Sequence, residues 1–301
     1  MPAPDNPGIV LAPYGTLYPP ALATYDRLRA AYEQAFPGSP VRLAFTSRLM
    51  IKRLAEKEGI AVPDLPAALR SLKGEGCRAV LLQSLQIVPG SEFHQAAALA
   101  RDWQAGDAAF DRLAVGLPLL AGLEDCRRIS ALLPALLEDP IGQDRGREGI
   151  NEKEDALVLV AHGTGHPADA LYSLLADVLR RDHGGAFNIF LGSIEGYPGL
   201  AEIAEDLLSR RAKTVRLLPF LLVAGGHANS DIAGTGPDSW MSTLSRKGLS
   251  VRADLRGLGE RQEIADVFIE HSKSALNSDQ QVYRLEWKCR EGCNSSSRSF
   301  S

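Results

Sequence analysis

The sequence predicts an α/β protein of two similar domains, each a parallel sheet flanked by helices, facing each other across a cleft. Short β-branched runs alternate with longer amphipathic stretches, which indicates βαβ units. The pattern also occurs twice. An apolar run over 8–12 leads into Tyr14-Gly15-Thr16, and another over 156–161 leads into His162-Gly163-Thr164. With 301 residues, the chain is long enough for two domains with a core each.

Each predicted strand is an apolar run, and nearly continuous hydrophobicity is typical of strands buried on both faces of a sheet. The predicted strands cover 8–12, 41–44, 79–87, 113–115, 157–161, 187–192, 214–220 and 250–253. Amphipathic stretches predict helices over 20–35, 47–58, 65–74, 92–107, 124–137, 169–181, 199–210, 239–247 and 261–275. We therefore expect one parallel sheet in each half of the chain.

Changes in composition divide the chain. We expect an N-terminal α/β domain over 1–138 and a linker or surface loop over 139–155, where the sequence is charged and lacks apolar periodicity. A C-terminal α/β domain over 156–276 carries the predicted site, and its last helix could pack on the first domain. The polar, serine-rich tail over 277–301 predicts disorder.

Charge and hydropathy exclude several classes of protein. A net charge of -4 with no basic stripe argues against a nucleic-acid-binding protein. Neither a signal peptide nor an apolar run of membrane-spanning length occurs, so we expect a cytoplasmic protein without a membrane partner. Four cysteines are too few for a disulfide scaffold, and the Cys289/Cys293 pair forms at most half a metal site.

Polar residues follow three predicted strands of the second half. In open parallel sheets, ligands bind beyond the carboxyl ends of the strands, and His162, Glu195 and His227 all occupy that position. Imidazole suits cobalt, nickel, iron and zinc, and two imidazoles with one carboxylate leave positions open for a substrate. Histidine also titrates near neutral pH, so the same residues could transfer protons.

Simpler interpretations of these residues exist. A single histidine at a strand end is more often a hydrogen-bonded loop residue than a ligand, and Glu195 could be a solvated carboxylate or a helix cap. Their occurrence at successive strand ends favours a functional site. Among the other histidines, His94 is a secondary candidate for a ligand or metal contact and His166 a surface or cleft residue. His183 and His271 are expected at exposed helix ends.

Over residues 8–276 the chain resembles the class II tetrapyrrole chelatases, specifically the anaerobic-type cobalt chelatases that act on sirohydrochlorin. Single phrases are weakly specific, but their order and spacing along the whole chain are distinctive. The phrases are Tyr14-Gly15-Thr16, Ala44-Phe45-Thr46-Ser47, Gln83-Ser84-Leu85-Gln86-Ile87, His162-Gly163-Thr164, Glu195-Gly196-Tyr197-Pro198, the run from Leu218 to Asp231, Asp238-Ser239-Trp240 and Gly257-Leu258-Gly259-Glu260. The charged segment between the domains is longer than is usual in the family, and the tail has no counterpart.

The resemblance implies that His162, Glu195 and His227 handle the metal, with Glu92 in the opposite wall of the cleft. It implies substrate-binding roles for Tyr14, Gly15, Thr16, Ser47, Glu92, Gly163 and Thr164. Backbone N–H groups at Thr16 and Thr164, together with Arg48, could bind the carboxylates of the macrocycle.

The expected function is ATP-independent insertion of Co²⁺ into sirohydrochlorin. No nucleotide-binding motif occurs, and no cofactor is expected beyond the substrate metal, which could also be Fe²⁺ or Ni²⁺. Two alternatives remain: an iron chelatase for sirohaem synthesis, and a non-catalytic carrier of a tetrapyrrole or metal. The expected partners are sirohydrochlorin and the divalent ion, and a homo-oligomer is possible.

Overall fold

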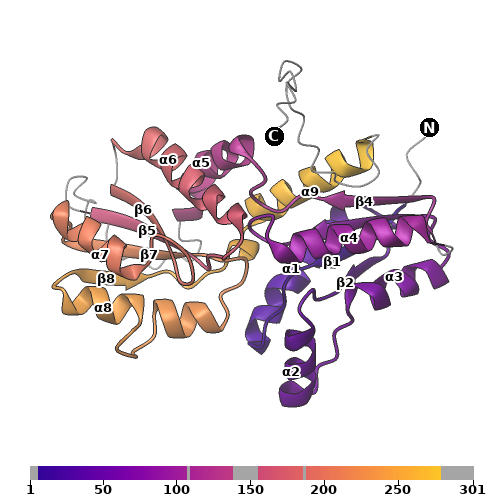
Figure 1. Cartoon of the computed structure of the whole chain (residues 1–301), viewed down its shortest axis with the longest axis horizontal. Helices are drawn as coiled ribbons and strands as arrows, with labels where there is room; N and C mark the ends of the chain where they lie inside the picture. The colour runs from indigo at the N-terminus through magenta and orange to yellow at the C-terminus, as the bar shows by residue number, and fades with distance from the viewer. Residues whose placement is uncertain (1–5, 107–108, 138–154, 186–187, 279–301) are drawn as a thin grey trace, which may run out of the picture.

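Two four-stranded parallel sheets form the centres of two lobes in the computed structural model of the chain (Figure 1). The structure describes residues 6–106, 109–137, 155–185 and 188–278. Nearly all of the expected tail and of the expected linker, together with Cys289 and Cys293, therefore lies outside the described residues. In the described ranges, no helix is long and apolar enough to cross a membrane.

The two sheets have the same strand order, which confirms the duplication predicted from the sequence. The first sheet has the order β2-β1-β3-β4, and the second has the order β6-β5-β7-β8. The strands are β1 (Gly8–Ala12), β2 (Val41–Leu43), β3 (Ala79–Ser84), β4 (Arg112–Gly116), β5 (Asp155–Ala161), β6 (Asn188–Ser193), β7 (Thr214–Phe220) and β8 (Ser250–Ala253). Central β1 and β5 each pair in parallel with two neighbours, so their carboxyl ends lie at corresponding edges.

The helices lie where the amphipathic pattern predicts them, with ends shifted by at most two residues. They are α1 (Leu22–Ala35), α2 (Arg48–Glu58), α3 (Leu65–Gly74), α4 (Ser91–Ala105), α5 (Leu123–Leu137), α6 (Ala170–His183), α7 (Leu200–Ser209), α8 (Trp240–Arg246) and α9 (Gln262–Asn277). Side chains of Ser47, Asp64 and Ser239 cap α2, α3 and α8, because each accepts a backbone N–H of the first turn.

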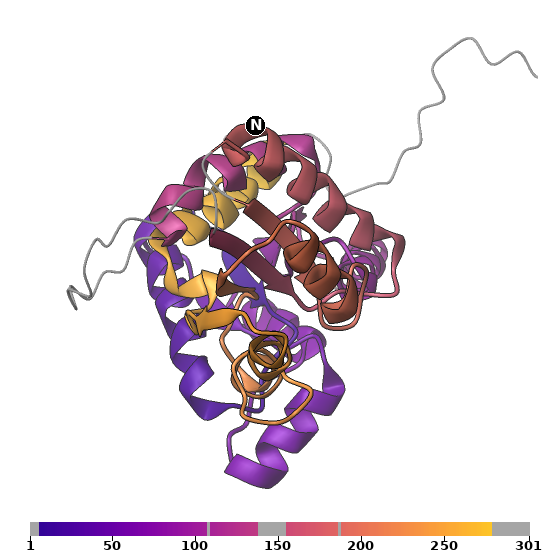
Figure 2. The ribbon, with the colours of Figure 1, turned by 90° about the vertical axis from the view of Figure 1, so that its left-hand side faces the viewer.

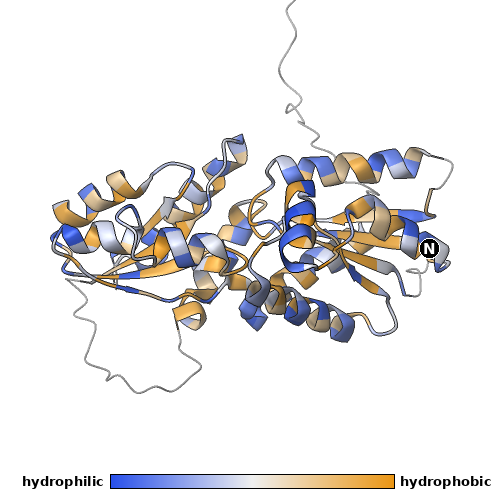
Figure 3. Cartoon of the chain, turned by 90° about the horizontal axis from the view of Figure 1, so that it is seen from below, coloured by the Kyte–Doolittle hydropathy of each residue, from blue (hydrophilic) through white to orange (hydrophobic). Residues whose placement is uncertain are grey.

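Alternate residues of each central strand face opposite sides of its sheet. In β5, Leu157 and Leu159 belong to the same apolar cluster as Leu175 of α6, whereas Val158 and Val160 cluster with residues of α7 and α8, including Trp240. The strands are thus buried on both faces, and Figure 2 shows helices on either side of the second sheet. Figure 3 shows the apolar strands enclosed by helices whose outer faces are hydrophilic.

The last helix of each half packs on the other lobe (Figure 1). Helix α9 contacts β3, β4 and α1, and the Ser272 hydroxyl lies 2.7 Å from Gln83 Oε1 and 2.8 Å from the Tyr32 hydroxyl. Helix α5 packs on α6, where the Ser130 hydroxyl donates to Asp182 over 2.6 Å. Helix α5, which the predicted N-terminal domain over 1–138 includes, therefore packs on the second lobe. An apolar helix face shows that the helix is buried, but not on which lobe.

Side chains also join α5 and α9 to each other. The Asp125 carboxylate lies 3.0 Å from His271 Nε2, and Arg128 lies 2.7 Å from Glu270. Near the other end of these two helices, the Arg261 guanidinium donates a 2.8 Å hydrogen bond to the Leu136 carbonyl. We call α5 and α9 the exchanged helices, because each packs on the lobe to which its half of the chain does not belong. Their contacts with each other connect the two lobes.

Candidate active site

Two equivalent turns follow the central strands, and glycine is required in both. Gly15 after β1 has φ +115° and Gly163 after β5 has φ +81°, which L side chains rarely adopt. A Cβ atom on Gly163 would lie 2.5 Å from the Gly196 backbone nitrogen, so only glycine lets the two loops approach. The Glu195 N–H then donates to the His162 carbonyl over 2.7 Å. This close approach brings the turn after β5 against the loop after β6.

The side chains of His162, Glu195 and His227 are neighbours. Glu195 Oε2 lies 3.8 Å from His162 Nδ1, and the rings of His162 and His227 have centroids 4.8 Å apart at an interplanar angle of 87°. The side chains are 43% exposed for His162, 63% for Glu195 and 48% for His227, so a ligand from solvent can reach all three. Three loops that are distant in sequence thus meet at one edge of the second sheet.

Hydrogen bonds determine which nitrogen of each imidazole is free. His162 Nδ1 lies 3.0 Å from the Gly163 carbonyl, and a carbonyl can only accept, so Nδ1 carries the proton. His227 Nδ1 lies 2.5 Å from a carboxylate oxygen of Asp231 and carries its proton for the same reason. In their neutral forms, both rings then have a lone pair on Nε2. That is the form in which imidazole binds a metal ion or accepts a proton.

Asp231 is a site residue to which sequence reasoning assigned no role. Its carboxylate contacts His227 through Oδ2, and its Oδ1 accepts a 2.8 Å hydrogen bond from the Ser230 hydroxyl. Partial burial opposes ionisation of this carboxyl, but the hydrogen bonds from His227 and Ser230 outweigh it and lower its pKa. The spacing of four residues was the available signal, because residues i and i+4 share a face of a helical turn.

The described residues contain no group of three His, Cys, Asp or Glu side chains already arranged to hold a metal ion. The contacts join His162 to each of the other two residues. An ion held by two imidazoles here would keep positions open for further donors. This arrangement suits temporary binding of an ion better than a closed structural metal site.

Several hydroxyls of the expected substrate-binding residues support turns. Thr16 Oγ1 accepts the Tyr18 N–H over 3.1 Å, Thr164 Oγ1 accepts the His166 N–H over 3.2 Å, and Ser47 caps α2. Each hydroxyl retains its own proton for donation to a carboxylate. The proposed use of the Thr164 backbone N–H is wrong, because that group donates to Asp169 over 2.9 Å. Tyr14, in contrast, is 46% exposed.

Glu92 lies in the first turn of α4 in the first lobe. It lines a cavity of about 180 Å³ together with Thr46, Arg48 and Gln95. The Thr46 hydroxyl oxygen is buried there without a hydrogen-bond partner. This cavity combines a cation, a carboxylate and an unpartnered hydroxyl beside the loop that follows β2.

A second histidine pair joins the lobes. The rings of His94 in α4 and His166 in the second lobe have centroids 5.1 Å apart. His166 Nδ1 accepts the Ala168 N–H, so the proton of its neutral ring is on Nε2. Burial, followed by the nearby positive charges of His166 and Arg101, lowers the pKa of His94 and favours its neutral form. Nε2 of the neutral His166 ring is therefore a hydrogen-bond donor and has no lone pair for a metal ion. This favours a contact between the lobes over a role as metal ligand.

Neither of the remaining two histidines is exposed, although His183 does end α6. His271 is 10% exposed and lies between Asp125 and the Leu117 carbonyl, and His183 Nε2 lies 2.9 Å from the Ser130 carbonyl. The expected exposure is wrong for both residues, and for the same reason. The exchange of α5 and α9 covers helix surfaces that would otherwise be open to solvent.

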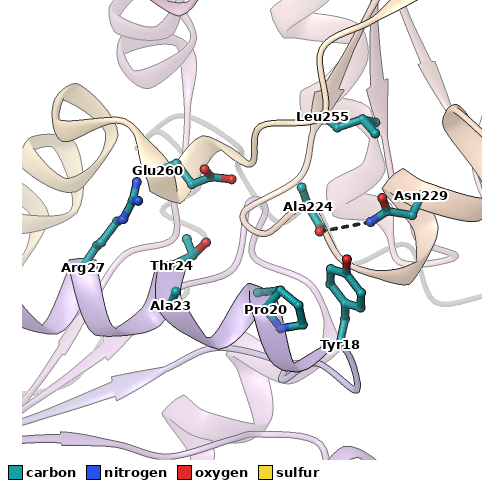
Figure 4. A pocket seen from close by; sticks show the side chains of 10 residues that line it. Tyr18, Pro20, Ala23, Thr24, Arg27, Ala224, Asn229, Leu255 and Glu260 are labelled. Atoms are coloured by element: carbon teal, nitrogen blue, oxygen red, sulfur yellow. Dashed lines mark hydrogen bonds between the residues drawn. The ribbon is translucent and has the colours of Figure 1, made fainter. Parts of the chain in front are cut away.

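The loop that carries His227 also faces the first lobe (Figure 4). A cavity of about 250 Å³ lies between them, with Tyr18, Thr24 and Arg27 on one side and Asn229, Leu255 and Glu260 on the other. Nearby, a Cβ atom on Gly225 would lie 3.2 Å from the Thr16 hydroxyl oxygen. The His227 loop is therefore part of the contact between the lobes.

The sequence model described as Cobalt chelatase (CbiK) matches residues 7–277. The chain belongs to this family of metal chelatases. A curated relative, sirohydrochlorin cobaltochelatase CbiKC of Nitratidesulfovibrio vulgaris, is 35% identical over 271 residues, covering 90% of this chain and 91% of the relative. The sirohydrochlorin cobaltochelatase of Salmonella typhimurium is 30% identical over 234 residues, covering 78% and 82%.

A solved structure of the same fold is the sirohydrochlorin chelatase SirB from Bacillus subtilis subspecies spizizenii in complex with cobalt. Its TM-score is 0.63 at 10% identity, and the match covers 93% of this chain and all of that one. SirB from Bacillus subtilis with Fe³⁺ has a TM-score of 0.61 at 11% identity, with the same coverage. At this identity the likeness concerns the fold, and it confirms the prediction of a chelatase-like architecture.

Proposed function

We propose that the protein inserts Co²⁺ into sirohydrochlorin without ATP, with His162, Glu195 and His227 as the residues that handle the metal. The observation that carries the proposal is the pair of neighbouring imidazoles that both have a free Nε2. Membership of the cobalt chelatase family and the names of the two curated relatives support the choice of reaction.

Metal insertion removes two pyrrole N–H protons as the ion enters the ring, so the enzyme has to hold an ion and then accept protons. Neutral imidazole does both through one lone pair. We propose that His162 and His227 first bind Co²⁺ through Nε2. As the ion moves to the pyrrole nitrogens, each imidazole regains its lone pair and can accept a proton.

Glu195 supplies negative charge beside His162, at 3.8 Å, and this charge favours both the bound cation and an imidazolium that forms later. Its exposure provides a route by which protons pass to solvent. Glu92 acts from the other lobe and positions the ion or the macrocycle. Tyr14, with Thr16, Ser47, Gly163 and Thr164 around it, contributes to the macrocycle site, and Arg48 pairs with a carboxylate of the macrocycle.

The test is an anaerobic assay that follows the absorbance of sirohydrochlorin with Co²⁺ in the presence and absence of protein. We expect the protein to accelerate insertion above the spontaneous rate, and an equal rate would reject the enzyme. A carrier would bind the macrocycle without changing that rate. Parallel assays with Fe²⁺ and Ni²⁺ address the iron chelatase, because imidazole ligands suit all three metals.

A further inference from the structure

We infer that Asp231 is a positioning residue for metal insertion, which holds the His227 ring in the tautomer and orientation that present Nε2 to the ion. The inference rests on the proposed function and concerns a residue that contacts neither the ion nor the macrocycle in that proposal. It starts from the shortest contact of the site, the 2.5 Å between Asp231 Oδ2 and His227 Nδ1.

The turn that carries Asp231 is rigidly held. Residues Ala228–Ile232 form one turn of π-helix, a form that is frequent at functional sites. Ala228 and Ile232 are fully buried, and the Asn229 side-chain amide donates to the Gly225 carbonyl over 2.8 Å. These contacts hold the backbone of the turn, and the turn places the Asp231 carboxylate next to His227.

Both carboxylate oxygens have partners. Oδ2 contacts His227, and Oδ1 lies 2.8 Å from the Ser230 hydroxyl, which is also 2.8 Å from the Gly226 carbonyl. A carboxylate held in this way orients the imidazole through Nδ1–H. Without it, the neutral ring of His227 can carry its proton on either nitrogen, and only one of the two tautomers can bind an ion through Nε2.

The two imidazoles of the site are held differently. A backbone carbonyl, that of Gly163, orients His162, whereas a side chain orients His227. A carboxylate also makes an imidazole a stronger base and a stronger ligand than a carbonyl does. His227 is thus the ligand whose properties a single substitution can change without moving the backbone.

The competing explanation is that Asp231 only stabilises an exposed turn. The experiment compares Asp231→Asn with Asp177→Asn in the full-length protein. Asp177 forms a similar exposed contact four residues from its partner, 2.7 Å to Arg181 on α6. Initial rates are measured with Co²⁺ and sirohydrochlorin varied separately, and Co²⁺ binding is measured by equilibrium dialysis without the macrocycle. Thermal unfolding of both variants reports their stability.

We expect Asp231→Asn to weaken Co²⁺ binding and raise the KM for Co²⁺ by about 10- to 100-fold, with little change in the KM for sirohydrochlorin. Asp231→Glu should recover part of the loss, and Asp177→Asn should change neither constant. Equal Co²⁺ binding by wild type and Asp231→Asn would overturn the inference, as would a loss explained by unfolding. A wild type that binds Co²⁺ but inserts none would instead reject the proposed reaction, and the dialysis would still test Asp231.

Discussion

The two lobes have the same sheet and the same turn after the central strand, yet only the second carries the imidazole pair. Tyr14-Gly15-Thr16 follows β1, and His162-Gly163-Thr164 follows β5, with a left-handed glycine in each. The difference at the first position of the turn replaces a phenol by an imidazole. A duplicated backbone therefore supplies two equivalent walls, and their side chains distinguish the wall that we propose handles the ion.

The surroundings of the two glycines also differ. A Cβ atom on Gly15 would meet the Phe45 ring at 2.6 Å, whereas one on Gly163 would meet the backbone of Gly196 at 2.5 Å. The first turn packs on side chains of its own lobe. The second brings in another loop and, with it, the Glu195 carboxylate. The close approach of two loops thus distinguishes the second turn from the first.

The largest effect is expected from making the second turn like the first. His162→Tyr removes a ligand and a base, and we expect kcat/KM for Co²⁺ insertion to fall by about 100-fold or more. Tyr14→Phe keeps the ring of the equivalent residue and removes only its hydroxyl, so we expect a higher KM for sirohydrochlorin and a much smaller loss of activity. Both are measured in the anaerobic absorbance assay, and similar losses in the two variants would mean that the walls are not specialised as described.

Substitution of the two turn glycines comes next. Gly163→Ala and Gly15→Ala should each cost about 1–3 kcal/mol in the free energy of unfolding, because alanine is strained at positive φ. Only Gly163→Ala pushes on the loop that carries Glu195, so it should also reduce the activity of the folded fraction by about 10-fold. Denaturant unfolding and the insertion assay separate the two effects. Equal specific activity of both variants would contradict the role of the close approach.

The exchanged helices predict a smaller, pH-dependent effect. Burial opposes ionisation of Asp125, but hydrogen bonds from His271 and Ala121 outweigh it and lower the pKa of the carboxyl. The ionised Asp125 carboxylate therefore stabilises the fold at pH values above the ordinary aspartate pKa of about 4. This stabilisation is lost as the pH falls through the lower pKa that Asp125 has in the folded protein. Asp125→Asn should cost about 1–3 kcal/mol at neutral pH. The difference from wild type should shrink in acid, as unfolding measured at several pH values would show.

The smallest effect on activity is expected from His183→Ala. This variant removes contacts to Ser130 on α5 and should cost about 1 kcal/mol in stability. The insertion rate of the folded protein should stay within about twofold of wild type, since the residue is in no proposed step. A loss of activity comparable to that of His162→Tyr would instead indicate that removal of any histidine impairs the protein. The effect of His162→Tyr would then not be evidence for the proposed site.

Local patterns along the chain predict the strands and helices well, because the formation of each element depends on residues that are close in sequence. Apolar runs place β7 (Thr214–Phe220) and β8 (Ser250–Ala253) with both ends correct. The ends of parallel strands must share an edge of the sheet, so the approximate meeting of His162, Glu195 and His227 is also predictable. The contact of Asp231 with His227 follows from neither pattern. Their spacing of four residues brings the two side chains together only if the loop forms a helical turn, and the sequence does not predict a helix there.

Sequence alone thus establishes the α/β class, the duplication and the three residues at the strand ends, because these follow from periodicity within short segments. The exchange of α5 and α9, the buried His271 and the free Nε2 atoms of the imidazole pair depend on contacts between distant segments. An amphipathic helix has to bury its apolar face, and its sequence does not say against which lobe. A histidine likewise has two possible tautomers in isolation, and only its neighbours in the folded protein select one.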